Sequence, residues 1–232
     1  MDISMVTAEV INRVFFIKIA EYGTASVVDV DGRQYLVTAK HLLGENFEIT
    51  DIEYFHAEKW ETLNVSVVGV ARGNSDIAVL STNIILCPSS LALPLGSECL
   101  TLGQDVYFLG YPFKLSTNGG EALKGRPCPF VKKGILSSLF DDGTGDFKIY
   151  IDAINNEGFS GGPIVFKAPG TNKFSMAGII SKFRTEQESV RCDEGNNTGW
   201  TVEYNTGLTI GIDISEAVKI IKTNPVGFLL PV

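Results

Sequence analysis

The chain carries the sequence Gly-Phe-Ser-Gly-Gly-Pro at residues 158–163. Three glycines around Ser160 free the backbone to make a tight turn, in which successive amide hydrogens can converge as an oxyanion hole requires. A glycine-rich hairpin between two strands is an alternative interpretation of the same residues. Because a serine is a weak nucleophile without a neighbouring base, the positions of the histidines distinguish the two interpretations.

The chain has two histidines, His41 and His56, and both precede Ser160. The pattern Gly-x-Ser-x-Gly also occurs in α/β-hydrolases, but there the acid and the histidine follow the serine. The sequence therefore excludes an α/β-hydrolase triad. The order histidine, aspartate, serine is the one found in chymotrypsin-like proteases.

His41 is the preferred base of the two histidines. It follows a strand-like run at residues 34–39, and a side chain at such a place can project from a rigid β edge into a cleft. His56 lies in the alternating stretch Tyr-Phe-His-Ala-Glu at residues 54–58. We therefore expect His56 to decorate a strand.

Asp76 is the preferred acid. It stands immediately before the apolar run Ile-Ala-Val-Leu at residues 77–80, as expected for a shielded carboxylate that accepts a hydrogen bond from the histidine ring and fixes its tautomer. Asp51 and Asp105 lack this context. A plain residue at the start of a strand is the alternative interpretation of Asp76.

Short apolar runs interrupted by turn residues dominate the sequence and predict β-strands. They are seldom separated by a segment of helical period, which favours barrels or a sandwich over a parallel α/β sheet. Asp31-Gly32 predicts a two-residue hairpin turn of type I′. The expected strands are residues 10–19, 24–30, 34–39, 65–70, 77–80, 106–110, 131–139, 147–151, 163–166, 174–181 and 207–212.

These runs divide into two expected β domains. Residues 1–85 form an N-terminal β-barrel that carries the histidine and the aspartate, and residues 105–213 form a C-terminal β-barrel that carries the serine. Residues 86–104 contain prolines and serines without sustained alternation and are interpreted as the interdomain linker. Residues 214–232 are the C-terminal helix and tail.

Two segments of the second half need separate interpretation. An acidic start, apolar residues at helical spacing and the stop Asn224-Pro225 predict a helix over residues 213–222 that packs back on the second barrel. Residues 185–201 are rich in Glu, Asp, Gly and Asn and are long for a plain hairpin. We interpret them as a disordered surface loop, with a role in substrate access as the alternative.

Three motifs together resemble the signature blocks of trypsin-like serine proteases. They are Thr-Ala-Lys-His at residues 38–41, Ser-Asp-Ile-Ala-Val-Leu at 75–80 and the glycine-rich block at 158–163. Residues 103–112, 134–137 and 151–155 resemble the second barrel of HtrA/Deg-type and related bacterial or viral trypsin-like peptidases. The resemblance covers about residues 23–222. It implies an all-β fold of two perpendicular six-stranded antiparallel β-barrels, chymotrypsin-like, with the active site in the cleft between them.

The resemblance also implies the roles of individual residues. Ser160 is the nucleophile, His41 the general base and Asp76 its orienting partner, in a serine endopeptidase that hydrolyses peptide bonds through an acyl-enzyme intermediate. Backbone amides of Gly158 and Ser160 form the oxyanion hole. Ser181, by its position in the motif, donates a supporting hydrogen bond to Asp76. An ordinary strand serine is the alternative for Ser181.

The same resemblance places the primary specificity pocket, which we expect to accept an apolar or small side chain, because an isoleucine replaces the acidic pocket floor of trypsin. The expected pocket residues are Ile154, Asn155, Glu157, Lys182, Phe183 and Leu208.

Two departures from the family pattern stand out. Phe159 replaces the acidic residue that captures the new N-terminus of an activated digestive trypsin, which leaves open an inactive resting conformation that a partner protein remodels. The PDZ domain of HtrA-type proteins is not found, so the chain is expected to be a bare protease domain. A latent protease or pseudoprotease that binds peptides, a viral polyprotein-processing protease, and a self-cleaving capsid-like protein with its C-terminus in its own active site stay open as alternatives.

Composition restricts the partners. The net charge of -8 and the pI near 4.8 oppose nucleic-acid binding, and the doublet Lys132-Lys133 is interpreted as solvated surface. No signal peptide or membrane span is recognised, so we expect a cytoplasmic protein that acts on a protein or peptide substrate. The four cysteines lack the spacing of a zinc site, and no metal or other cofactor is expected. Free thiols are the prediction, with a pair between Cys87 and Cys99 as the alternative.

Overall fold

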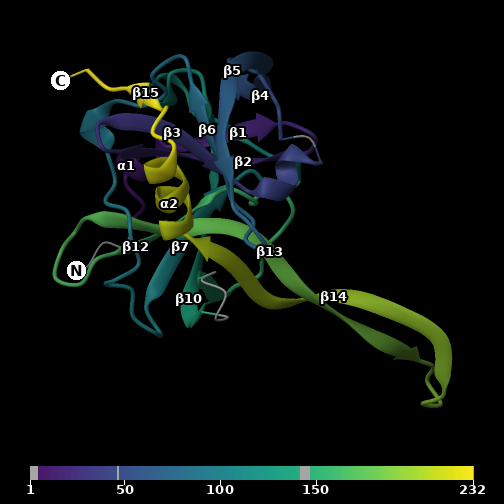
Figure 1. Ribbon diagram of the computed structural model, residues 1–232. Helices are drawn as coiled ribbons and strands as arrows, with labels where there is room; N and C mark the ends of the chain where they lie inside the picture. The colour runs from purple at the N-terminus through teal and green to yellow at the C-terminus, as the bar shows by residue number, and fades with distance from the viewer. Residues whose placement is uncertain (1–4, 46, 142–146, 232) are drawn as a thin grey trace.

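A computed structural model describes residues 5–45, 47–141 and 147–231 of the chain (Figure 1). The strands of the first half form one antiparallel sheet in the order β15-β3-β2-β1-β4-β5-β6, and β3 also pairs with β6. That extra pairing closes the six strands from β1 through β6 into a ring. The strands of this sheet are β1 (Val14–Lys18), β2 (Tyr22–Val30), β3 (Arg33–Thr38), β4 (Asp51–His56), β5 (Lys59–Val70), β6 (Ala78–Thr82) and β15 (Phe228–Leu229).

The strands of the second half close into a barrel in the order β10-β11-β14-β13-β12-β7. They are β7 (Asp105–Gly110), β10 (Phe130–Asp141), β11 (Phe147–Asp152), β12 (Pro163–Lys167), β13 (Phe174–Arg191) and β14 (Asn197–Asp213). A small ribbon of β8 (Thr117–Asn118) and β9 (Pro127–Cys128) stands apart from both. The expected all-β fold class is therefore confirmed.

Helical segments are short. They are α1 (Ala8–Ile11), α2 (Ser215–Thr223) and the 3-10 turns η1 (Lys40–Leu43), η2 (Ser89–Leu91), η3 (Pro112–Lys114) and η4 (Glu121–Leu123). Within the described ranges, the helices are too short or too polar to cross a lipid bilayer. All four cysteines are free, as predicted, so Cys87 and Cys99 do not pair.

Side-chain alternation explains how the two sheets form one body. Phe15 and Ile17 of β1 point into the first barrel, whereas Phe16 between them joins a cluster that includes residues of both sheets. There the ring of Phe16 stacks on Tyr111 with centroids 4.7 Å apart. Because such a closely packed shared core resists sliding, the two sheets keep a fixed position relative to each other.

The turn between β2 and β3 confirms the hairpin prediction. Asp31 and Gly32 have φ angles of 50° and 73°, and Val30 pairs with Arg33 on either side of them. Positive φ at both central residues is the requirement of a type I′ turn. The prediction of one strand over residues 10–19 was wrong at its start, because α1 occupies residues 8–11 and β1 begins at Val14.

The C-terminal helix exists as predicted, but it packs mainly against β5 and β6 of the first sheet (Figure 1). Asn224 Nδ2 donates to Val68 O at 2.9 Å, and a Cβ on Gly69 would lie 2.8 Å from Ile220 Cγ2. The expectation that α2 packs on the second barrel was therefore wrong. The tail then adds β15 to β3, with Phe228 opposite Gln34. The described tail is therefore not among the residues that line the cleft around His41 and Ser160.

Residues 185–201 are not a disordered loop, which corrects the sequence interpretation. β13 and β14 continue past the barrel as a two-stranded arm that projects far from the body (Figure 1). The pairing runs from Thr185 opposite Asn205 to Arg191 opposite Asn197. The domain boundaries at residues 85, 104 and 213 stay predictions, and residues 1–4 and 232 at their outer limits lie outside the described residues.

Candidate active site

His41 lies in the 3-10 turn η1, directly after β3 ends at Thr38. The neighbouring Lys40 ammonium donates to the carbonyl oxygens of Ala71 and Gly73 at 3.1 and 3.2 Å. These bonds tie the histidine turn to the loop between β5 and β6. The loop that carries the predicted acid is therefore fixed beside the predicted base.

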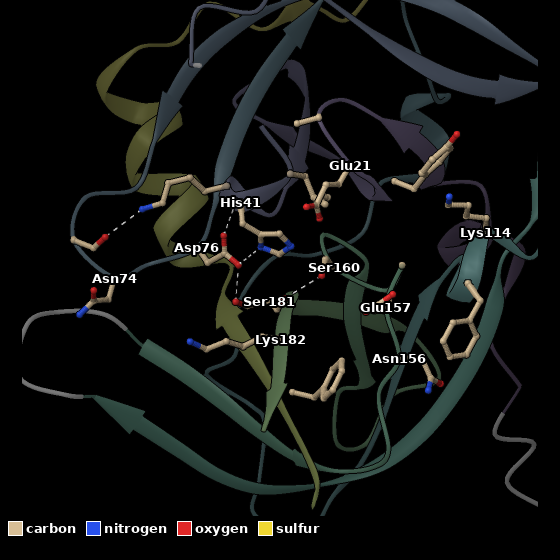
Figure 2. Close-up of a pocket in the computed structure, with 18 residues that line it drawn as sticks. Glu21, His41, Asn74, Asp76, Lys114, Asn156, Glu157, Ser160, Ser181 and Lys182 are labelled. Atoms are coloured by element: carbon tan, nitrogen blue, oxygen red, sulfur yellow. Dashed lines mark hydrogen bonds and ion pairs between the residues drawn. The ribbon is translucent and has the colours of Figure 1, made fainter. Parts of the chain in front are cut away.

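Asp76 ends that loop and accepts three hydrogen bonds. The backbone amide of His41 donates to Oδ1 at 2.9 Å, while His41 Nδ1 and Ser181 Oγ donate to Oδ2 at 2.7 and 2.6 Å. Because an ionised carboxylate can only accept hydrogen bonds, Nδ1 of the neutral imidazole must carry the proton. Nε2 is then left unprotonated and can act as a base (Figure 2).

The two groups perturb each other's ionisation. The hydrogen bond that His41 donates to Asp76 raises the pKa of His41 above its ordinary value, although burial opposes this shift. Burial alone would raise the pKa of Asp76, but the hydrogen bonds from His41 and Ser181 outweigh it and leave that pKa lowered. Asp76 therefore stays ionised at neutral pH and stabilises the protonated imidazole.

Ser160 stands on a turn that only glycines permit. Gly158 and Gly161 on either side of it have φ angles of 98° and 81°. A Cβ at Gly158 would lie 2.1 Å from the carbonyl oxygen of Tyr111, and one at Gly161 would lie 2.0 Å from that of Thr24. The backbone on both sides of the serine is thus packed directly against other backbone, where no side chain fits.

The serine turn belongs to the second barrel but is bonded to β2 of the first. Thr24 donates from its amide to Ser160 O at 2.9 Å and from Oγ1 to Gly158 O at 2.7 Å. Ser26 Oγ donates to Gly161 O at 2.9 Å. These bonds cross between the barrels and hold Ser160 opposite His41.

Ser160 Oγ donates to the carbonyl oxygen of Ser181 at 3.1 Å. Among the described residues it makes no hydrogen bond to His41, although the two side chains face the same cleft (Figure 2). The structure therefore brings His41, Asp76, Ser160 and Ser181 together, with the serine hydroxyl turned toward β13. The hydroxyl changes its position by rotation about the Cα–Cβ bond of Ser160, which is the motion that would turn it toward the imidazole.

The peptide bond before Gly158 has a defined orientation. Glu157 O accepts from the amide of Phe113 at 3.0 Å. Because the peptide is trans, the Gly158 N–H points to the side opposite the Glu157 carbonyl. Within the described part of the chain, neither the Gly158 nor the Ser160 amide has a hydrogen-bond acceptor.

Comparison with known protein families gives one match to this geometry and its surrounding sequence. Residues 23–170, well over half of the chain, match the model of the trypsin-like peptidase domain. The chain belongs to this family. The resemblance drawn from the three motifs is thereby confirmed, and the family match supports the expected enzyme class, a serine endopeptidase.

The fold of this trypsin-like peptidase domain is also found in solved structures. A serine-to-alanine variant of the HtrA-type protease AlgW with a tripeptide is 20% identical, with a TM-score of 0.60 over 94% of this chain and 63% of that one. A serine endoprotease from Yersinia pestis is 18% identical, with a TM-score of 0.60 over 94% of this chain and 66% of that one. The domain thus spans about two thirds of these two proteins.

The protein Rv3671c from M. tuberculosis H37Rv, a serine-to-alanine mutant in an inactive form, is 17% identical to this chain. The TM-score is 0.57 over 97% of this chain and 91% of that one. At these identities the likeness concerns the fold, and it supports the chymotrypsin-like architecture. A comparison with curated protein sequences gives no match.

The position that holds an acid in digestive trypsins is Phe159 in this trypsin-like peptidase domain, and its ring is fully buried in the second barrel. It packs against Phe108 with centroids 5.2 Å apart. Lys132 Nζ lies 5.4 Å from the Phe159 ring and donates to Ile154 O at 2.6 Å and to Asn156 Oδ1 at 2.5 Å. Lys132 therefore tethers the segment that precedes the turn carrying Gly158 and Ser160.

The interpretation of the lysine doublet as solvated surface was wrong for Lys132. Burial lowers the pKa of Lys132, and its ammonium points under the 154–156 segment. Lys133, by contrast, is exposed and forms an ion pair with Asp105 at 2.7 Å. The alternation of a β-strand accounts for the difference, because neighbouring residues point to opposite faces.

The cleft lined by His41, Asp76 and Ser160 has a volume of about 900 Å³. Figure 2 shows the residues around it. Of the predicted pocket residues, Glu157, Lys182 and Phe183 line it. Asn155 is buried behind the wall, where its carbonyl accepts from Asn205 Nδ2 at 2.7 Å.

The predictions for Ile154 and Leu208 were wrong. Ile154 is 60% exposed and points away from the cleft, and Leu208 lies against Phe140 and Tyr150 on the outside of the barrel. Beyond Ile154, the buried side chain of Asn155 accepts a hydrogen bond from the amide of Asn156 at 2.8 Å.

Sequence reasoning missed several of the cleft residues, among them Tyr22, Phe113 and Lys114. Lys114 Nζ lies 4.2 Å from the centroid of the Tyr22 ring, which forms a cation–π contact at one end of the cleft. Phe113 has a φ of 53°, unusual for an aromatic residue, and its side chain is 61% exposed. No local motif marks these residues, because only the folded chain brings the loop after β7 next to β2.

Proposed function

We propose that this chain hydrolyses peptide bonds within polypeptides, with His41, Asp76 and Ser160 as its catalytic triad and a covalent acyl-enzyme intermediate. The observation that carries the proposal is the hydrogen-bonded pair of His41 and Asp76 beside Ser160 in one cleft. It fixes the imidazole tautomer that a serine nucleophile needs. A tripeptide is present in the structure of the AlgW serine-to-alanine variant, which has the same fold, and this agrees with a peptide substrate.

The proposed reaction begins when Ser160 Oγ rotates from Ser181 O to His41 Nε2. Oγ then attacks the scissile carbonyl carbon, and its proton passes to Nε2. The protonated imidazole returns that proton to the amine nitrogen as the C–N bond breaks, and the acyl group stays on Oγ. A water molecule repeats the sequence and releases the acid.

The amides of Gly158 and Ser160 are proposed to stabilise the negative charge on the carbonyl oxygen in both steps. Loss of a single such donor costs about 10² to 10³ in rate in serine proteases. The Glu157–Phe113 hydrogen bond supports a preformed oxyanion hole. Activation by an N-terminal ion pair is not required in this account, since Phe159 is held by packing rather than by charge.

Burst kinetics with p-nitrophenyl acetate test the proposal. An acyl-enzyme mechanism predicts a rapid release of nitrophenolate equal to the enzyme concentration, followed by a slower steady state. Peptide mapping of the quenched protein should then find the acetyl group on Ser160. Steady release without a burst, or acetyl groups on lysines alone, would argue against the proposal.

A latent serine protease is the second candidate, favoured by the Ser160–Ser181 hydrogen bond, which keeps the hydroxyl away from the imidazole. A latent protein would give no burst by itself and would bind peptides without cleaving them. The burst experiment therefore separates the two candidates.

The pH dependence of activity follows from the His41 pKa. Only neutral His41 accepts the serine proton, so kcat/KM must rise with pH through the pKa of the free enzyme. Because Asp76 raises that pKa, the midpoint is expected above the ordinary value of about 6.5. Rates measured on one peptide pool between pH 5 and 9, in buffers of constant ionic strength, give the midpoint, and a midpoint below 6.5 would contradict the account.

Lys132 is proposed to act as a positioning residue for the turn that carries the oxyanion-hole amides of Gly158 and Ser160. The Lys132→Met variant removes both hydrogen bonds to the 154–156 segment, and kcat/KM should fall by about tenfold, since misplacement by a fraction of an ångström already costs rate. The pH midpoint should stay unchanged because the triad is untouched. The exposed neighbour provides the control, and Lys133→Met should keep full activity.

Two results would contradict this role. Equal losses in both lysine variants would assign the effect to charge, and full activity of Lys132→Met would show that packing alone holds the turn.

A further inference from the structure

The arm formed by β13 and β14 begins at the active-site cleft. Ser181, Lys182 and Phe183 of β13 line the cleft, and the same strand continues to Arg191. With 18 and 17 residues, β13 and β14 are much longer than the usual strand of 3–10 residues. The side chains of residues 184–204 are all exposed, so packing on the barrel does not explain this length.

One edge of β13 is unpaired along the arm. β12 pairs with β13 only between Phe174 and Ile179, whereas β14 accompanies β13 on the other side as far as Arg191. From Lys182 outward, no further described strand pairs with β13. Residues 182–191 contain no proline, and such an open edge is able to accept another strand.

The edge also has a chemical pattern. Glu186 and Glu188 point to one face of the arm, while Thr185, Gln187 and Ser189 point to the other. Glu186 is paired with Arg184 at 2.6 Å, but Glu188 has no ion-pair partner among the described residues. A strand added beside β13 would place its alternate side chains next to these carboxylates, where lysine or arginine is favoured.

We propose that the free edge of the arm, at residues 184–191 of β13, binds a more distant part of the substrate polypeptide, several residues before the scissile bond, as an added antiparallel strand with basic residues at alternate positions. This inference rests on the proposed peptidase function. The direction follows from geometry, because a chain that runs antiparallel to β13 and has its scissile bond at Ser160 carries its earlier residues toward Arg191. The edge from Lys182 to Arg191 extends about 30 Å at roughly 3.3 Å per residue.

Peptide pools of matched composition test this proposal. Each pool has the same randomised core, and a Lys-Thr repeat of ten residues is placed either before or after it. The extension before the core should raise kcat/KM for core cleavage by about tenfold or more, since a few edge hydrogen bonds suffice for that factor. The extension after the core should change it by less than twofold. Equal gains from both placements would overturn the proposal.

Two further substrates separate backbone pairing from simple charge attraction. N-methylation of alternate residues in the upstream extension should abolish the gain in one of the two possible registers, because only every second amide faces the edge. A Glu-Thr repeat before the core should give a smaller gain than the Lys-Thr repeat. If both methylated extensions kept the full gain, strand addition would be contradicted.

Protein variants complete the test. Replacement of residues 187–203 by Asn-Gly closes the arm with a short type I′ turn and should remove the gain while cleavage of the bare core continues. The Glu188→Lys variant should reduce the preference for the Lys-Thr repeat. Glu203→Lys, with the same charge change on the opposite face, is the control and should leave the preference unchanged. An undiminished gain in the shortened protein would overturn the proposal.

Failure of this inference is distinguishable from failure of the proposed function. Core cleavage without any dependence on upstream length refutes the arm proposal alone. If the wild type cleaves no core at all, the proposed function fails, and the same peptides are then measured by fluorescence anisotropy on Ser160→Ala. A Kd about tenfold lower for the upstream extension would support the arm proposal, and equal Kd values would refute it.

Discussion

Replacement of Ser160 by alanine is expected to lower kcat for peptide hydrolysis by about 10⁶, the size of the loss when a serine protease nucleophile is removed. The variant loses the oxygen that forms the acyl-enzyme, and no other described hydroxyl lies in the same relation to His41. The rate should be measured on a peptide pool by mass spectrometry of new termini.

The fold should not change in this variant. Ser160 Oγ makes one described hydrogen bond, to Ser181 O, so the thermal midpoint is expected to stay close to that of the wild type. Peptidase activity within tenfold of the wild type would show that another residue is the nucleophile.

The second large effect is expected for Asp76→Asn, which should lower kcat by about 10⁴. Asparagine has nearly the same shape, but its amide group donates to His41 Nδ1 where the carboxylate accepted. The proton of the neutral imidazole then moves to Nε2, and the base loses its free lone pair. Ser181 also loses its charged acceptor.

A matched control comes from the aspartates that the sequence left as weaker candidates. Asp51 is exposed in β4 and lies away from the cleft, so Asp51→Asn should keep the wild-type rate. A loss of less than tenfold in Asp76→Asn, or an equal loss in both variants, would contradict the assignment of the acid.

The fold class and the motif residues could be predicted from sequence because each has a local cause. The type I′ turn at Asp31-Gly32 needs positive φ at two successive residues, and glycine and aspartate supply it. Gly158 and Gly161 mark a turn that excludes side chains. Ser181 followed from the motif, and the structure places its hydroxyl 2.6 Å from Asp76.

The features that were missed depend on contacts between distant segments. Lys132 looked like solvated surface because the sequence does not show which face of β10 turns toward residues 154–156. α2 was assigned to the second barrel because it follows that barrel in the chain, but its apolar face meets β5 and β6. In both cases the deciding contact is with a segment elsewhere in the chain.

The arm was missed for a different reason. Residues 185–201 are polar and contain turn formers, which in isolation indicate a loop, and an isolated two-stranded ribbon is only marginally stable in water. Here the ribbon is a continuation of β13 and β14, whose pairing is already fixed in the barrel. The register of the arm is set by the strand pairing in the barrel and not by the composition of the arm.

The measurement that most directly tests the central claim is labelling of the purified protein with a fluorophosphonate probe, read by intact mass and peptide mapping. The account predicts one adduct per chain, located on Ser160, that is lost in Ser160→Ala and strongly slowed in Asp76→Asn. A wild-type protein that stays unlabelled, or an adduct that persists in Ser160→Ala, would contradict the claim that His41 and Asp76 activate Ser160 as a nucleophile.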